Sequence, residues 1–183
     1  MDSAGSGYYS GIANSIVGTA NRTQNSNGSL IFGAGNEITN SYTSISGLPG
    51  GLFSTTPTSA KDLANILREA TSESDGGGST MAIGGGNKAD YTQKTQITGV
   101  NNKVTGTAGN IAKLNSVSGF KNTVTNASNN IIMGNDHTVT ANNTIAIGGL
   151  SSADTRSAAN TTSIGYDAKV SKEGGVALGY KSN

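Results

Sequence analysis

Short apolar runs that end in glycine recur along this chain at nearly constant spacing. The clearest are Ile131–Met133 before Gly134 and Ile145–Ile147 before Gly148, whose two glycines are 14 residues apart. The full set of equivalent glycines is Gly18, Gly33, Gly47, Gly84, Gly99, Gly119, Gly134, Gly148, Gly165 and Gly179. Most steps between them are 14 or 15 residues. A short period kept over so many copies is typical of a solenoid in which each repeat forms one coil.

Two columns of apolar or small residues keep a fixed distance from these glycines. The first column lies two residues before each glycine and the second lies five residues after it. Isoleucine and valine at these positions favour strands. Two apolar points per coil predict a thin core that no coil can bury alone. Asparagine, serine or threonine at the remaining fixed positions can hydrogen bond backbone at the corners. The pattern predicts an all-β fold, a parallel solenoid of about ten 14–15-residue coils.

A disordered polar chain is the alternative reading of this composition. Such a chain would not hold isoleucine or valine in register over so many copies, so we favour the solenoid.

The repeat divides the chain into three segments. We expect β-roll repeats in residues 1–47, an insertion in residues 48–79 and a continuing β-roll in residues 80–183. Two coils of the last segment are longer than the others, with extra residues near Thr107–Lys113 and in a polar loop at Gly149–Asn160.

The insertion contains the one segment with a clear helical pattern, at about residues 59–71. Ser59 and Asp62 resemble a capping box at its start. One apolar stripe then follows at helical spacing, formed by Leu63, Ile66, Leu67 and Ala70. A helix this short is not stable alone, so the stripe must pack on the roll, on a neighbouring copy or on a partner.

Several of the expected strands are apolar on both faces. The run Leu30–Phe32 is an example, because neighbouring side chains of a strand point to opposite faces. A strand that is apolar on both faces has both faces covered. One face meets the core of its own coil, and a single thin roll has nothing to cover the other. We infer that other chains cover it and that the protein is an oligomer.

Composition and charge narrow the possible partners. Charged residues make up 13% of the chain and the formal net charge is +1, which argues against a nucleic-acid partner. No apolar run is long enough to span a bilayer, so we expect no membrane insertion by this segment. The absence of cysteine excludes disulfides and thiolate metal sites.

Candidate chemistry is sparse. His137 is the only histidine, and it stands at a corner position where other copies have asparagine, so we interpret it as a corner residue. Gly84–Asp90 is weakly similar to a calcium-binding nonapeptide, but it occurs once and is better read as a turn. No catalytic set can be assembled from the sequence. We therefore expect no catalytic, cofactor or metal site.

Three of the repeat copies carry a resemblance to a known family. Thr80–Gly84, Asn143–Gly148 and Gly175–Gly179 are similar to the head repeats of trimeric autotransporter adhesins, the YadA-like bacterial surface proteins, whose motif reads roughly Asn-Ser-Val-Ala-Ile-Gly. One such copy is a weak signal, whereas ten in period are a strong one.

The resemblance implies a left-handed parallel β-roll in each chain and a homotrimeric head. It also implies a head carried on a coiled-coil stalk and anchored in the bacterial outer membrane by regions outside this chain. The implied role is adhesion to a host-cell surface protein, an extracellular matrix protein or another cell. The chain departs from the family pattern because it has no stalk, neck or anchor, and its helical insertion is extra. We expect it to be a piece of a longer protein.

Insertions on a repeat scaffold are where binding surfaces tend to lie. The candidate partner contacts are therefore Phe53, Leu63, Ile66, Leu67 and Arg68 in the insertion, with Leu150 and Arg156 second. Two alternatives stay open, an ice-binding solenoid that uses outward threonines such as Thr125 and a polysaccharide-active β-helix enzyme.

Overall fold

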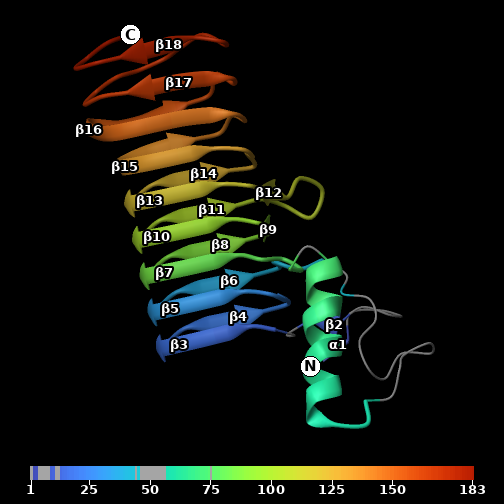
Figure 1. Ribbon diagram of the computed structural model, residues 1–183. Coiled ribbons are helices and arrows are strands. Elements are labelled where there is room, and N and C mark those ends of the chain that lie inside the picture. The colour runs from blue at the N-terminus through green and yellow to red at the C-terminus, as the bar shows by residue number, and fades with distance from the viewer. Residues whose placement is uncertain (1, 4–8, 11–12, 44, 46–56, 75) are drawn as a thin grey trace.

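The structure is a computed structural model, and it describes residues 2–3, 9–10, 13–43, 45, 57–74 and 76–183. It is mostly parallel β-structure with one helix, and the strands stack in a column consistent with a β-solenoid (Figure 1). The coarse fold class predicted from the sequence is thus confirmed.

The coils contribute long and short strands to a 14-stranded parallel sheet, and in β15 and β16 one strand runs through both positions. The long strands are β3 (Ser15–Thr19), β5 (Leu30–Ala34), β7 (Met81–Gly85), β10 (Gln96–Val100), β13 (Ser116–Phe120), β15 (Ile131–Val139), β16 (Thr144–Arg156), β17 (Thr161–Ile164) and β18 (Val176–Leu178). The short strands are β4 (Arg22–Gln24), β6 (Glu37–Thr39), β8 (Lys88–Asp90), β11 (Lys103–Thr105) and β14 (Thr123–Thr125). The sheet is continuous because β15 pairs with both β13 and β14.

Four further strands and the helix complete the described part. β9 (Thr92–Gln93) and β12 (Ala112–Lys113) form a parallel pair on a third side of the coils. β1 (Asp2–Ser3) and β2 (Tyr9–Ser10) form an antiparallel pair. The helix α1 (Ala60–Glu73) lies within the insertion.

The glycines that define the repeat pair with one another across neighbouring strands. The pairing runs through Gly18, Gly33, Gly84, Gly99, Gly119, Gly134 and Gly148. The repeat read from the sequence is therefore the repeat of the structure over these strands.

One of the predicted copies does not form a coil between its neighbours. Gly33 pairs directly with Gly84, so no strand lies between β5 and β7. Gly47, which the spacing places between them, is outside the described residues, although Ile45 of the same predicted copy is buried. The 14 residues from Gly33 to Gly47 match the length of one coil, but β5 pairs with β7, the strand that follows the insertion.

The two ends of the insertion meet at one buried side chain, that of Asn27, and we call its hydrogen bonds to both ends the clamp. Asn27 accepts hydrogen bonds at Oδ1 from the backbone N–H groups of Thr43 (3.2 Å) and Gly78 (2.7 Å). Its Nδ2 donates to the Thr43 carbonyl at 2.6 Å. The hydroxyl groups of Ser41 and Thr80 also hydrogen bond across the gap at 2.6 Å. The chain thus leaves the stack after Ser41 and returns to it at Thr80.

The core consists of the two inward columns. Ile31, Ile97 and Ile132 from the long strands and Val104 and Val124 from the short strands are fully buried. Fully burying side chains of this size stabilises the fold by roughly 1.5–3 kcal/mol each. Ile16, in the strand at one end of the stack, is by contrast 46% exposed.

The helix prediction is confirmed. The N-cap is Ser59, whose side chain accepts a hydrogen bond from the Asp62 backbone N–H at 3.1 Å. The helix extends two residues beyond the predicted end, to Glu73.

Candidate functional site

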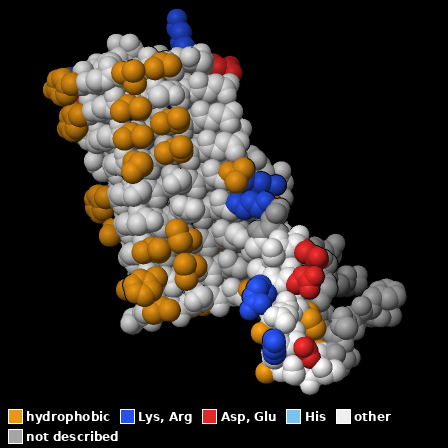
Figure 2. Space-filling model, viewed as in Figure 1, with side chains coloured by type: hydrophobic (Ala, Val, Ile, Leu, Met, Phe, Trp, Pro, Cys, Tyr) orange, Lys and Arg blue, Asp and Glu red, His pale blue; other side chains and the backbone are white. Residues whose placement is uncertain are grey.

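The outward surface of the long strands carries exposed apolar side chains. We call this surface the outward face; its large apolar residues with more than a third of their area exposed are Val17, Leu30, Phe32, Val100, Phe120, Ile131, Met133, Ile164, Val176 and Leu178. Figure 2 shows them as stripes that run along one face of the stack. Single exposed apolar residues are ordinary, but rows that continue from coil to coil mark an interaction surface.

The outward face is more polar in its middle coils, where β10 and β13 each keep one exposed apolar side chain at the strand end, Val100 and Phe120. Gln96 and Thr98 of β10 and Ser116 and Ser118 of β13 occupy the positions that Leu30 and Phe32 occupy in β5, according to the strand register. The apolar rows therefore form two groups, near the N-terminal and C-terminal coils, with a polar belt between them.

The predicted contacts on α1 remain open to solvent in the described part of the chain. Leu63 and Leu67 are 39% and 37% exposed, Ile66 is half-buried, and Ala70 alone of the stripe is buried. Arg68 is exposed and donates a hydrogen bond to Asn65 Oδ1 at 2.9 Å. Phe53 lies outside the described residues.

The predicted contacts in the second loop are buried instead. The loop expected at Leu150–Arg156 is instead part of β16, which pairs with β15 again from Asp154 to Arg156 after a register shift, while Ser151, Ser152 and Ala153 are exposed. Leu150 is only 5% exposed and Arg156 only 3%. Arg156 pairs with Val139, so its side chain points inward where the preceding coils have valine.

Asparagines stacked along one corner of the coils form a continuous hydrogen-bonded ladder. In a typical step, Asn102 Nδ2 donates to the Gly119 carbonyl at 2.7 Å, and Asn102 Oδ1 accepts from the backbone N–H of Asn122 at 3.0 Å. The members are Asn21, Asn36, Asn87, Asn102 and Asn122. Because each side chain satisfies backbone groups of the next coil, the ladder fixes the coil register.

His137 takes the next place in this ladder, as the sequence predicts. Its backbone N–H donates to Asn122 Oδ1 at 3.1 Å, and its ring Nε2 lies 2.7 Å from the Gly148 carbonyl oxygen. A carbonyl only accepts, so Nε2 carries the proton and Nδ1 is an acceptor. Arg156 Nε donates to that Nδ1 at 3.4 Å.

Arg156 is a buried cation held by neutral groups. Besides His137 Nδ1, its guanidinium donates to Ser163 Oγ at 2.8 Å and to the Ala168 carbonyl at 3.0 Å. These acceptors offset part of the desolvation that a buried charge would otherwise suffer.

The surroundings of His137 oppose its protonation. Burial is the main cause that lowers the pKa of His137, and the nearby positive charge of Arg156 lowers it further. The Gly148 carbonyl and the carboxylates of Asp154 and Asp136 act in the opposite direction and are outweighed. His137 is therefore a neutral, structural histidine at neutral pH.

The stability of the C-terminal coils is expected to fall as the pH drops below the ordinary histidine pKa of about 6.5. The unfolded chain then binds a proton that the folded chain excludes, so the free energy of unfolding decreases on acidification. Carboxyl groups titrate near pH 4 and contribute little above about pH 5.5. Thermal unfolding at about pH 7.5 and 5.5 measures the effect. The acid-induced fall in Tm should be smaller in His137→Asn, which restores the ladder residue, and equal falls in both proteins would contradict this account.

The outward side of the short strands is mixed in charge. Arg22, Glu37, Lys88 and Lys103 follow one another in register, and Arg22 and Glu37 form an ion pair at 2.6 Å. The neighbouring column runs Gln24, Thr39, Asp90, Thr105 and Thr125. Other side chains thus interrupt the threonines, and this surface is not the flat, regular array of threonines that an ice-binding solenoid would use.

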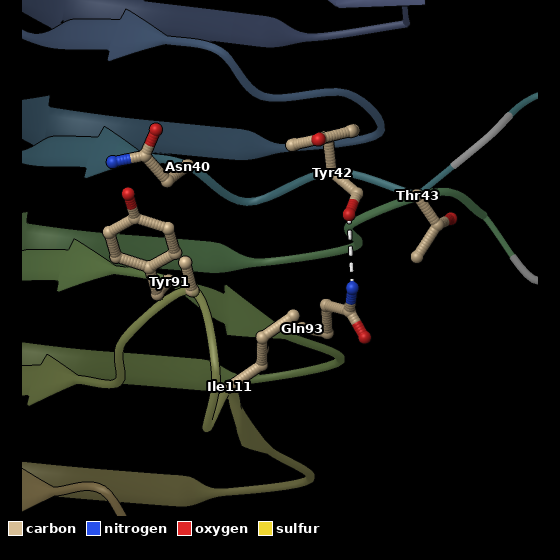
Figure 3. A pocket seen from close by; sticks show the side chains of 7 residues that line it. Asn40, Tyr42, Thr43, Tyr91, Gln93 and Ile111 are labelled. Atoms are coloured by element: carbon tan, nitrogen blue, oxygen red, sulfur yellow. Dashed lines mark hydrogen bonds between the residues drawn. The ribbon is translucent and has the colours of Figure 1, made fainter. Parts of the chain in front are cut away.

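A hollow opens beside β9, on the third side of the coils. It has a volume of about 370 Å³ and is lined by Asn40, Tyr42, Thr43, Tyr91, Gln93, Ala108 and Ile111 (Figure 3). This hollow was not predicted from the sequence. A signal was present, because Tyr91 stands seven residues after its glycine, at a corner where other coils have Asn25, Asn40, Gly106 and Asn126.

No metal site or membrane-spanning helix is evident in the part of the chain that the structure describes. Within it, no three His, Cys, Asp or Glu side chains are grouped so that they could hold a metal ion. The helix in the same residues is too short and too polar to cross a bilayer.

Comparison of the chain with protein-family models, with curated proteins and with solved structures gave no match.

Proposed function

We propose that this protein is the head of a trimeric, non-enzymatic bacterial surface adhesin. In this proposal each chain is a left-handed β-roll of about ten coils, three chains pack through their outward faces, and the head stands on the cell surface through regions outside this chain. The observation that carries the proposal is the outward face, whose apolar rows have no cover within the described chain.

The two groups of apolar rows fit packing between identical chains. Closed symmetry brings the same surface of each copy to a common axis. Phe32 would then meet Phe32 of its sister chains near one end, and Met133 would meet Met133 nearer the other. The polar belt at Gln96 to Ser118 would form a wetter part of the same contact, and ordered water is common in such interfaces.

In the proposed mechanism a stiff support presents a contact surface to the partner. The asparagine ladder and the paired strands make a stiff column, and the helix α1 is held out from it by the clamp at Asn27. Three copies of a weak contact on one head give avidity well above that of a single contact. The exposed stripe of Leu63 and Leu67 is the contact that we propose for the host-cell or matrix partner.

Beads coated with the purified chain are expected to adhere to host-cell monolayers, to matrix proteins or to other bacteria. Leu63→Ser combined with Leu67→Ser should lower this adhesion at least several-fold, because apolar anchors carry most of the energy of such contacts. Ala64→Ser combined with Glu69→Ser, on other faces of the same helix, should leave it unchanged. Adhesion is scored by counting bound beads.

Other results would decide against parts of the proposal. Undiminished adhesion of the leucine variant would remove α1 as the contact, and a trimer that adheres to no surface would remove the adhesin role. Thermal hysteresis would favour the ice-binding alternative. Turnover of a polysaccharide would favour the enzyme.

A further inference from the structure

Departures from the regular repeat meet at the hollow beside β9. The long insertion leaves the stack at Tyr42 and Thr43, and both line the hollow. The shorter insertion, predicted near Thr107–Lys113, supplies Ala108 and Ile111 from the coil beyond. The coil between these two supplies Tyr91 and Gln93. Two independent insertions and one unusual corner residue thus build a single concave surface (Figure 3).

Tyr91 is held in a conformation that disfavours it. Its φ is 49°, in the left-handed region, where Asn25 and Asn40 stand at the same corner with φ of 49° and 51°. Asparagine tolerates this region, whereas a bulky side chain there is a genuine outlier and costs about 1–2 kcal/mol. Lys94, Leu114 and Lys121 hold a similar φ at other corners of the stack, so this conformation alone does not mark a binding site. What sets Tyr91 apart is that its side chain lines the hollow from a corner where asparagine is the unstrained choice.

The walls of the hollow are fixed by backbone pairing. The N–H of Ala112 donates to the Tyr91 carbonyl at 3.0 Å, and the N–H of Leu114 donates to the Gln93 carbonyl at 3.1 Å. Gln93 Nε2 donates to the Tyr42 carbonyl at 3.0 Å, which orients its amide across the opening (Figure 3). The site is therefore largely formed before any ligand arrives, which reduces the entropy lost on binding.

The polar side chains of the hollow are hydroxyl and amide groups, and none is charged. Neither phenolic oxygen, of Tyr42 or of Tyr91, forms a hydrogen bond within the described part of the chain. Both rings are half-buried, so each presents a face and a hydroxyl group. Ile111 and Ala108 add apolar surface. The volume of about 370 Å³ lies at the lower end of the range for small-ligand sites, about 300–1,000 Å³.

We propose that this hollow binds the terminal mono- or disaccharide of a neutral glycan. A sugar ring has an apolar C–H face that packs on an aromatic ring, and an edge of hydroxyl groups that both donate and accept hydrogen bonds. Tyrosine faces beside phenolic and amide groups match both features. An anionic sugar or an acidic peptide would find no cation in this lining. The inference rests on the proposed adhesion role for its biological purpose, but not for its chemistry.

The position of the hollow is compatible with a trimer. In the shared view of Figures 1 and 2, β9 and β12 lie at the opposite edge of the stack from the apolar stripes. Packing through the outward faces therefore leaves the hollow open, and one head would carry three glycan sites.

The test is an array of neutral and charged glycans probed with the purified chain, followed by calorimetry with the free saccharide that gives the strongest signal. A neutral glycan should bind, and Tyr91→Asn should weaken its affinity about tenfold or more because an aromatic anchor is lost. The same variant removes backbone strain, so its Tm should not fall. The matched control, Tyr180→Asn at the far end of the stack, should bind as the unaltered chain does.

Each other outcome decides against the saccharide site. Absence of any glycan binding, equal affinity in Tyr91→Asn, or binding confined to charged glycans or to peptides would overturn it. If glycans fail to bind while coated beads still adhere, only this inference fails. If the saccharide binds while beads adhere to nothing, the adhesin role fails and the saccharide site stands.

Discussion

Gly119→Val is expected to prevent the chain from folding. Gly119 has φ +123°, a region that side-chain-bearing residues rarely adopt. A Cβ atom at this position would lie 1.9 Å from the carbonyl oxygen of Gly134 in the next coil. That oxygen belongs to a paired strand and also accepts the hydrogen bond of Asn122 Nδ2 at 2.8 Å. Relief of the clash therefore requires two neighbouring coils to separate.

The free energy of unfolding should fall by more than about 4–5 kcal/mol, a loss that few single substitutions cause. This is comparable to the whole stability of many domains. Circular dichroism of the purified variant should show loss of the strand signal at room temperature. Gly109→Ala is the matched control, since no heavy atom lies within 4 Å of a Cβ built there, and its stability should change by less than about 0.5 kcal/mol. A folded Gly119→Val protein with unaltered unfolding would contradict the close stacking of the glycines.

Phe32→Lys combined with Met133→Lys is expected to convert the proposed trimer into folded monomers. Both side chains point away from the core of their own chain and are 57% and 48% exposed, so the single roll should tolerate lysine. At a closed interface, however, the substitutions would place like charges close together and out of water. Uncompensated buried charges cost several kcal/mol each, roughly the scale of a whole interface.

The control for this variant is Thr138→Lys. Thr138 lies on the outward side of the short strands. It pairs with Thr123, which in turn pairs with Lys103, so the chain already has a lysine at the equivalent position two coils away. It should remain a trimer. Light scattering gives the mass, and circular dichroism shows whether the coils are intact. A Phe32→Lys, Met133→Lys protein with undiminished mass would place the chain–chain contact elsewhere.

Much of the fold is readable from periodicity because a solenoid repeats one local solution. The same inward position is Ile31, Ile97 and Ile132 in different coils, and all three are fully buried. The glycine column pairs as its spacing predicts over most of the stack. The helix follows from its cap and its stripe, and it begins where Ser59 predicts.

Spacing alone does not decide which strands pair. The step from Gly33 to Gly47 has the length of a coil, yet Gly33 pairs with Gly84. The pairing is settled by contacts distant in sequence, the clamp at Asn27 and the bond between Ser41 and Thr80.

Arg156 shows a second limit of pattern reading. A charged residue in a polar stretch predicts a loop, because burying a charge is unfavourable. In the structure three acceptors from the two neighbouring coils, His137 Nδ1 on one side and Ser163 Oγ and the Ala168 carbonyl on the other, receive the guanidinium. None of these contacts is visible as a local sequence pattern.

The candidate sites differ in how far the sequence reveals them. The outward face could be predicted, since strands such as Ile131–Met133 are apolar on both sides. The hollow could not, because it exists only where two insertions converge in space. Its one sign in the sequence is Tyr91, which stands at a corner where other coils have asparagine.

The central claim is that identical chains cover the outward face of one another. The molar mass of the purified, unaltered chain, measured by light scattering after size-exclusion chromatography, tests it directly. We predict a single species with three times the mass of one chain, which is 18.3 kDa. A monodisperse species of 18.3 kDa that keeps its strand signal would contradict the claim.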